Sequence, residues 1–145
     1  GYEIGEMMSK YGADGVQMAT RFVLTKECDV SEAFKQVYLN AKQEDVVLMD
    51  SPVGLPGRAI RNRFLHRLQA GESVYDGLCK RNCLKKCSHS FCIIDRLDMS
   101  RAGDVEEGLV FSGEHVWKLS DIPSVRDLID RLVAEAESVY APVPV

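Results

Sequence analysis

The sequence predicts a protein of the α/β class, and three observations support this prediction. The chain has 145 residues, which is the usual length of one domain. Its composition, 46% hydrophobic and 28% charged, is that of a soluble protein able to bury a core. Along the first fifty residues, two helical patterns alternate with two short apolar runs, an order that is typical of α/β layers.

The first fifty residues predict helix, strand, helix and strand. The first helix is indicated by apolar residues at helical spacing, Ile4, Met7, Met8 and Tyr11. Gly12 is a suitable stop for it, and the apolar run Gly15–Ala19 that follows suits a buried strand. Ser31 is a good N-cap for a helix with the apolar face Ala33, Phe34, Val37, Tyr38 and Ala41. The run Val46–Met49 predicts the second buried strand.

The later residues predict mainly loops and helices. Ser51–Gly57 is a loop by composition. A helix is indicated after it by the apolar residues Ala59, Ile60, Phe64, Leu65 and Leu68. A short helix near Asp95–Ala102 and the apolar run Gly108–Phe111 come next. Ser124 then caps a last helix with the apolar face Val125, Leu128, Ile129, Leu132, Val133 and Ala136.

Basic residues are concentrated in one part of the chain. The formal net charge of −4 gives no overall reason to bind nucleic acid or a membrane surface. Between Arg58 and Lys86, however, eight basic and two acidic residues give a local charge of +6. We interpret this run first as a solvated face, or as one that pairs with acidic parts of the same molecule. No apolar run approaches the ~20 residues that span a bilayer.

Four of the five cysteines lie close together, at positions Cys79, Cys83, Cys87 and Cys92. The first three are four residues apart and would share one face of a helix, with the fourth able to fold back. Four thiolates can hold zinc or an iron–sulfur cluster, but the Cys-x₃-Cys spacing leaves free or packed thiols open as the alternative. The fifth, Cys28, suits a small buried hydrophobic position. An odd number of cysteines without a secretory signal predicts the reducing cytoplasm.

The segment Gly12–Phe22 is the most distinctive in the chain. At the end of the predicted strand it places small residues, which let backbone N–H groups approach an anion, and the hydroxyl of Thr20. Its sequence, Gly-Ala-Asp-Gly-Val-Gln-Met-Ala-Thr-Arg-Phe, resembles the nitronate monooxygenase family, formerly called 2-nitropropane dioxygenases. It is also similar to the related FMN-dependent enoyl-ACP reductases. Further similarity lies in Ser51–Asn62 and in Gly103–Gly113.

The resemblance implies that the chain is the C-terminal portion of a flavin-binding TIM barrel. Such barrels have ~250 residues, so residues 1–50 would form the last barrel units and residues 51–145 a mostly helical, cysteine-containing extension. In that fold Gly15–Ala19 would be the eighth strand. The FMN contacts would come from Gln17, Met18, Ala19 and Thr20. Ala19 departs from the family, which commonly has glycine there, and its methyl group would crowd the phosphate.

The implied activity is the oxidation of alkyl nitronates by O₂ through the flavin. An enoyl-ACP reductase acting on an enoyl thioester, with NAD(P)H as donor, is the close alternative. An alternative of another class is a basic, metal-binding module for protein or nucleic-acid partners, although the net negative charge disfavours nucleic acid. No histidine of the chain occupies a family motif, so we assign no catalytic residue and expect the isolated chain to be inactive.

The edge of the strand predicted at Gly15–Ala19 indicates self-association of the isolated chain. An unpaired edge offers backbone N–H and C=O groups to a second chain, which favours pairing between copies. We therefore expect homo-oligomers. Light scattering at high protein concentration checks this, and a strictly monomeric profile would contradict it.

Overall fold

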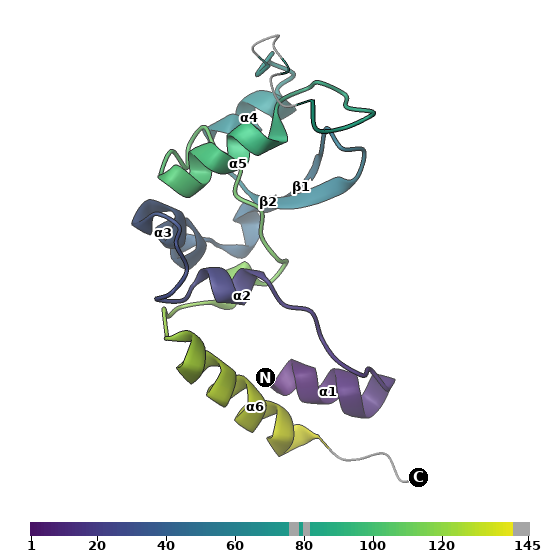
Figure 1. The fold of residues 1–145 in the computed structure, drawn as a ribbon, viewed down its shortest axis with the longest axis vertical. Coiled ribbons are helices and arrows are strands. Elements are labelled where there is room, and N and C mark those ends of the chain that lie inside the picture. The colour runs from purple at the N-terminus through teal and green to yellow at the C-terminus, as the bar shows by residue number, and fades with distance from the viewer. Residues whose placement is uncertain (76–78, 80–81, 141–145) are drawn as a thin grey trace. The chain divides into compact units, whose positions relative to one another are not determined.

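The computed structural model describes residues 1–75, 79 and 82–140 (Figure 1). Its contacts divide the chain into two compact units. The first is Gly1–Cys28 with the described part of Asp121–Val145, and the second is Asp29–Ser120. The structure is mixed α/β as predicted, but the described residues form a single two-stranded sheet and close no barrel. None of the described helices is long and apolar enough to cross a membrane.

Two helices packed side by side make up most of the first unit. These are α1 (Tyr2–Tyr11) and α6 (Val125–Val139), which lie next to each other in Figure 1. Their backbones approach closely at Gly5, where a Cβ atom would lie 2.5 Å from the carbonyl oxygen of Ala136. The absence of a side chain at Gly5 therefore sets the spacing of the two helices.

Helix ends follow the capping residues that the sequence indicates. Gly12 ends α1 in the left-handed conformation, with φ of 65°. The Ser124 hydroxyl accepts a hydrogen bond of 3.1 Å from a first-turn amide of α6. Ser31 does the same at 3.2 Å for α3 (Glu32–Asn40). Each bond satisfies a backbone group that a helix end leaves unpaired, and the predictions of these three helices are confirmed.

The strand predicted at Gly15–Ala19 is not formed, and this prediction was wrong. Residues 13–19 adopt neither helix nor strand, and the chain passes directly into the four-residue α2 (Thr20–Val23). A strand needs a neighbour for its backbone hydrogen bonds, and no described segment pairs with this run. An apolar run indicates that a segment can be buried in a sheet, but it contains no information on whether a partner is present. The self-association inferred from this edge stays a prediction.

The second unit is built around a β-hairpin. Besides α3 it contains the 3₁₀ turn η1 (Gln43–Asp45), β1 (Val46–Asp50), β2 (Pro56–Ile60), α4 (Arg63–Gln69), α5 (Ile93–Ala102) and the 3₁₀ turn η2 (Val116–Lys118). β1 and β2 pair antiparallel, with Val46 opposite Ile60. The predicted strand at Val46–Met49 and the predicted short helix near residues 95–102 are confirmed. The hairpin joins residues on both sides of the domain boundary predicted between residues 50 and 51. That boundary was predicted for the intact barrel, and it stays a prediction.

β2 is a strand, whereas apolar spacing predicted that Ala59 and Ile60 belong to a helix. The Asn62 side chain accepts a hydrogen bond of 3.0 Å from a first-turn amide and so begins α4 after these residues. Before this cap, the backbone of residues 56–60 forms hydrogen bonds on both of its edges. One edge pairs with β1, and on the other the Ile60 amide donates to the Val110 carbonyl at 2.9 Å. These non-local hydrogen bonds decide the conformation, and they are not visible in the spacing of side chains.

A hydrophobic core holds the hairpin, α4 and the later segments of the second unit together. Its buried members are Met49, Ala59, Phe64, Leu65, Val74, Phe91 and Leu109. Phe64 and Phe91 meet edge to face, with ring centroids 5.2 Å apart. Because Val74 precedes the four clustered cysteines and Phe91 lies beside the last of them, the core anchors the cysteine-bearing segment near both ends.

Three arginines of the second unit converge on the carboxylate of Glu107. The distances are 2.7 Å for Arg63 Nε, 3.2 Å for Arg67 Nη1 and 3.2 Å for Arg96 Nη1. The side chain of Glu107 is only 19% exposed. Part of the basic run therefore pairs with an acidic residue of the same molecule, as the first interpretation expected. Because Arg63 and Arg67 form ion pairs within the molecule, their charges are less available to phosphate groups, and the alternative of a nucleic-acid-binding module is weakened.

We expect Glu107→Gln to destabilise the second unit by about 1–2 kcal/mol at neutral pH, because charge-assisted hydrogen bonds weaken. Desolvation raises the pKa of Glu107, but the hydrogen bonds and charges of the three arginines outweigh it, so the pKa lies below the ordinary 4.5. A carboxyl group whose pKa falls on folding adds stability that is present above its unfolded pKa and lost as the pH drops through the folded value. Urea denaturation should show the difference between wild type and variant at neutral pH and its decline in acid. A difference that does not change with pH would contradict this account.

Candidate functional site

The residues that the resemblance assigns to FMN lie together in the first unit. Gln17, Met18, Ala19 and Thr20 are consecutive, and Thr20 is the first residue of α2. Gln17 and Ala19 are exposed, whereas Met18 and Thr20 are half-buried. The structure therefore places them at the surface of their unit. Their assignment to the flavin stays a prediction.

The backbone of this segment is open to a ligand. A Cβ atom at Gly15 would meet no other atom within 4 Å. The small side chain of Ala19 and the hydroxyl group of Thr20 are groups that allow a phosphate to approach the main chain. The space at Gly15 and the small, exposed side chain of Ala19 leave the main chain accessible at these two positions.

The arginine that follows this segment holds the first unit together. Arg21 Nη2 pairs with Asp121 Oδ1 at 2.6 Å, and Arg21 Nη1 donates to the carbonyl groups of Asp121 and Leu24. Burial lowers the pKa of Arg21, and the negative charge of Asp121 opposes that effect. The guanidinium group thus ties α2 to the segment before α6, and we do not assign it to the flavin phosphate.

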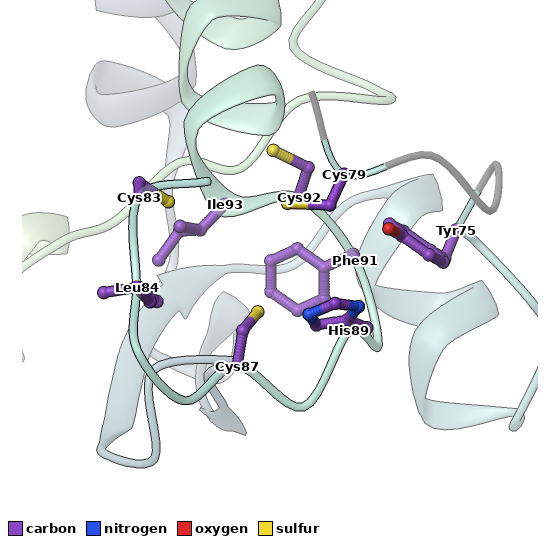
Figure 2. A pocket seen from close by; sticks show the side chains of 9 residues that line it. All are labelled: Tyr75, Cys79, Cys83, Leu84, Cys87, His89, Phe91, Cys92 and Ile93. Atoms are coloured by element: carbon purple, nitrogen blue, oxygen red, sulfur yellow. The ribbon is translucent and has the colours of Figure 1, made fainter. Parts of the chain in front are cut away.

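A second candidate site is a pocket of the second unit that is lined by all four clustered cysteines, Cys79, Cys83, Cys87 and Cys92. The other lining side chains are Tyr75, Leu84, His89, Phe91 and Ile93 (Figure 2). Two of the cysteines are exposed and two are half-buried, and all are free thiols. The structure therefore brings the four clustered cysteines to one pocket, and their assignment as metal ligands stays a prediction.

The clustered cysteines are not on a helix, so the shared helical face was a wrong prediction. The described residues 82–92 contain no helix or strand. The chain instead bends at Asn82 and His89, where φ is 48° and 58°. Positive φ is uncommon outside glycine, and these two bends turn the segment around the pocket. Among the residues that the structure describes, no three Cys, His, Asp or Glu side chains are arranged so that they could hold one metal ion.

The walls of this pocket are largely apolar. Leu84, Phe91 and Ile93 contribute hydrocarbon surface, and the rings of Tyr75 and His89 lie 5.8 Å apart at one side. Burial raises the pKa of the Cys92 thiol, and a hydrogen bond from the backbone of Asp95 opposes that effect. A thiolate in such surroundings needs a positive partner, either a nearby cation or a metal.

The three histidines occupy separate places. His66 is exposed on α4, and His89 lies in the cysteine pocket beside Tyr75. His115 is exposed, and its ring meets that of Trp117 edge-on, with ring centroids 6.4 Å apart. None of them belongs to the segment assigned to FMN.

Sequence reasoning missed several residues that line the cysteine pocket. His89 lies between Cys87 and Cys92, and a histidine within a cysteine run is a signal that could have included it. Tyr75 and Phe91 have no comparable signal. They reach the pocket because the core fixes the chain next to them.

Comparison with known proteins identifies the family. A model of the nitronate monooxygenase family matches residues 4–135, which include the segment Gly12–Phe22, the hairpin and the cysteine pocket. The chain belongs to the nitronate monooxygenase family. The resemblance noted in Gly12–Phe22 is thereby confirmed, and the family is one of oxidoreductases.

Curated relatives of this nitronate monooxygenase-family chain are longer than the chain itself. A hydroxy-methyl-oxo-octahydro-indene-carboxyl-CoA dehydrogenase of Mycobacterium tuberculosis is 27% identical over 87% of the chain and 44% of its own length. A probable nitronate monooxygenase of Staphylococcus haemolyticus is 28% identical over 91% of the chain and 35% of its own length. One of Staphylococcus saprophyticus is 37% identical over 39% of the chain and 16% of its own length. The chain thus spans less than half of each of these relatives.

Solved structures of FabK from Thermotoga maritima share the fold of this nitronate monooxygenase-family chain. One is 24% identical, with a TM-score of 0.67 over 89% of the chain and 39% of FabK. A variant of the same protein is 23% identical, with a TM-score of 0.70 over 94% of the chain and 38% of FabK. The chain therefore has the fold of part of a FabK-like barrel.

Proposed function

We propose that the protein is an FMN-dependent nitronate monooxygenase, which oxidises alkyl nitronates with O₂. The family match over residues 4–135 carries this proposal. Relatives from two Staphylococcus species are named as probable nitronate monooxygenases, which supports it. When bound, FMN supplies the redox chemistry of such an enzyme.

The residues that we assign to FMN are Gln17, Met18, Ala19 and Thr20. The open backbone at Gly15 leaves room for the phosphate, and Thr20 Oγ1 would donate a hydrogen bond to it. The methyl group of Ala19 would limit how closely the FMN phosphate approaches the main chain. A catalytic base must lie within hydrogen-bond reach of the substrate beside the flavin. We assign no histidine of this chain to that role and expect the isolated chain to be inactive.

A thioester oxidoreductase is the second candidate. The relatives from Mycobacterium tuberculosis and Rhodococcus jostii are carboxyl-CoA dehydrogenases by name, and each match covers 87% of the chain. On this candidate the substrate is an acyl or enoyl thioester, and NAD(P)H is the electron donor in the reducing direction. The residues assigned to FMN serve both candidates, since either chemistry needs the same flavin contacts.

Two assays on the full-length protein distinguish these candidates. The protein is purified with its flavin, and oxygen uptake is measured with an alkyl nitronate. Oxidation of NAD(P)H is measured separately with an enoyl thioester. We expect nitronate-dependent oxygen uptake. Thioester reduction without nitronate oxidation would favour the second candidate, and a folded protein that binds no flavin would contradict both.

We expect Thr20→Val to weaken FMN binding by about tenfold or more, because hydrogen bonds to charged groups contribute about 1.5–3 kcal/mol. Valine keeps the shape of threonine but lacks the hydroxyl donor. Ala19→Gly is the matched change, and it should keep or tighten binding because it removes the methyl group next to the phosphate. Fluorescence titration of the flavin-free protein measures both affinities, with circular dichroism to confirm the fold. Equal affinity of wild type and Thr20→Val would contradict the assignment.

A further inference from the structure

The cysteine pocket has no role in the proposed flavin chemistry. Its four thiols gather around a space of about 20 Å³, which admits little more than one water molecule. In the part of the chain that the structure describes, no three potential ligand side chains are placed to share one metal ion. The chemistry open to thiols around so small a space is the formation of a disulfide bond between two of them.

The core holds the two ends of the cysteine-bearing segment close together. Val74 and Phe91 are both buried in the hydrophobic core of the second unit. Arg96 of α5 donates from its Nη2 atom to the Val74 carbonyl at 2.9 Å. The amide of Arg96 also donates to the carbonyl of Cys92, the residue that precedes α5, at 3.1 Å. The chain before the first clustered cysteine therefore lies against the turn of α5 that follows the last one.

Cys79 and Cys92 are the two clustered cysteines nearest to these anchored ends. Cys79 follows Val74 by five residues, and Cys92 is adjacent to Phe91. Both side chains line the pocket and lie next to each other in Figure 2, whereas the other two clustered cysteines stand apart from them. A disulfide bond requires Cα atoms about 4.4–6.8 Å apart, and anchoring of both ends by one core favours such an approach.

The two thiols differ in their access to solvent, and this difference sets the order of a reaction. Cys79 is exposed, whereas Cys92 is half-buried. Burial raises the pKa of the Cys92 thiol, so little of it is thiolate at neutral pH. A soluble oxidant therefore reacts with Cys79 first, and Cys92 reacts afterwards with the sulfur atom of Cys79.

We propose that Cys79 and Cys92 form a reversible disulfide bond when the protein meets a low-molecular-weight disulfide such as oxidised glutathione. The Cys79 thiolate attacks one sulfur of that disulfide, which forms a mixed disulfide and releases one reduced thiol. The Cys92 thiolate then attacks the Cys79 sulfur, closes the protein disulfide and releases the second reduced thiol. The two cysteines lose two electrons and two protons, which the two released thiols take up. The proposal does not depend on the flavin or on its substrate.

The test is oxidation of the full-length protein in a glutathione redox buffer, followed by acid quenching and alkylation of the remaining thiols. Intact mass spectrometry counts the alkylated thiols, and peptide mapping without reduction identifies the bonded pair. We expect the segment to lose two thiols, to retain no glutathione and to recover both thiols in dithiothreitol. The predicted product is one linked peptide that contains Cys79 and Cys92.

Cys92→Ser separates this reaction from the ordinary oxidation of an exposed thiol. Serine is a good N-cap for α5, so circular dichroism should be unchanged. The variant lacks the second step, so Cys79 should retain one glutathione and form no linked peptide. Cys79→Ser should form no linked peptide either. Cys28→Ser is the matched control, because Cys28 belongs to the other unit, and it should form the disulfide as the wild type does.

Three results would each overturn the proposal. The first is a wild type that keeps all the thiols of this segment in the oxidising buffer. The second is a disulfide that joins a different pair of cysteines. The third is a Cys92→Ser variant that loses two thiols of the segment without retaining glutathione.

Discussion

Replacement of Asn62 by alanine is expected to reduce the free energy of unfolding of the second unit by about 3 kcal/mol. The side chain has two roles in the structure. Its Oδ1 accepts the amide hydrogen bond that begins α4, at 3.0 Å. Its Nδ2 donates to the carbonyl oxygens of Val105 and Gly108, both at 2.7 Å. Alanine would remove a helix cap and leave two poorly solvated carbonyl groups without their donor.

Two comparison variants separate these roles of Asn62. Asn62→Ser keeps a capping oxygen but cannot reach the two distant carbonyls, so its loss should be intermediate. Ser31→Ala removes only a cap, that of α3, and should cost about 1 kcal/mol. Urea denaturation followed by circular dichroism gives each value. An Asn62→Ala loss no larger than that of Ser31→Ala would show that the bonds to Val105 and Gly108 add nothing.

Gly108→Ala is expected to destabilise the second unit by about 3 kcal/mol, because the new methyl group has no space. A Cβ atom at Gly108 would lie 2.5 Å from Ser100 Cβ and 2.6 Å from Ser100 Cα, in the body of α5. Ser100 is fully buried, and its hydroxyl group donates to the Leu109 carbonyl at 2.7 Å. Backbone atoms of a helix cannot move aside as a flexible side chain can. The substitution therefore pushes α5 away from the buried run that pairs with β2.

Gly15→Ala is the matched control for Gly108→Ala. A methyl group at Gly15 meets no atom within 4 Å, so the stability should change by less than about 0.5 kcal/mol. Thermal denaturation of the two variants beside the wild type measures the contrast. Equal melting temperatures for wild type and Gly108→Ala would show that α5 adapts to the added volume.

The elements that the sequence predicted well are those with local signals at their ends. The helix ends are set by Ser31, Ser124 and Gly12, which act within one helical turn through hydrogen bonds or backbone freedom. Their effect can therefore be predicted from residues that are adjacent in the sequence. Two of the wrong predictions, a strand at Gly15–Ala19 and a helix that included Ala59, concern segments without such a signal. Their conformation depends on whether a distant segment supplies hydrogen bonds.

The candidate sites show the same division. The motif in Gly12–Phe22 was sufficient to indicate the family, because its residue types form a specific pattern. The spacing of the cysteines indicated a cluster of thiols but predicted a helical face that does not exist. Only the bends at Asn82 and His89, and the anchoring by the core, place the four thiols around one pocket.

The sequence by itself determined the α/β class, the family, the capped helices and the identity of the thiol-bearing residues. These properties depend on residue types and on contacts within a few positions of the chain. The tertiary structure alone decided that β2 is a strand and that three arginines pair with Glu107. It also decided that the Asn62 side chain, at the start of α4, donates to the carbonyl group of Gly108. These features depend mostly on groups about forty residues apart in the chain, or on hydrogen bonds of the main chain, and side-chain patterns record neither.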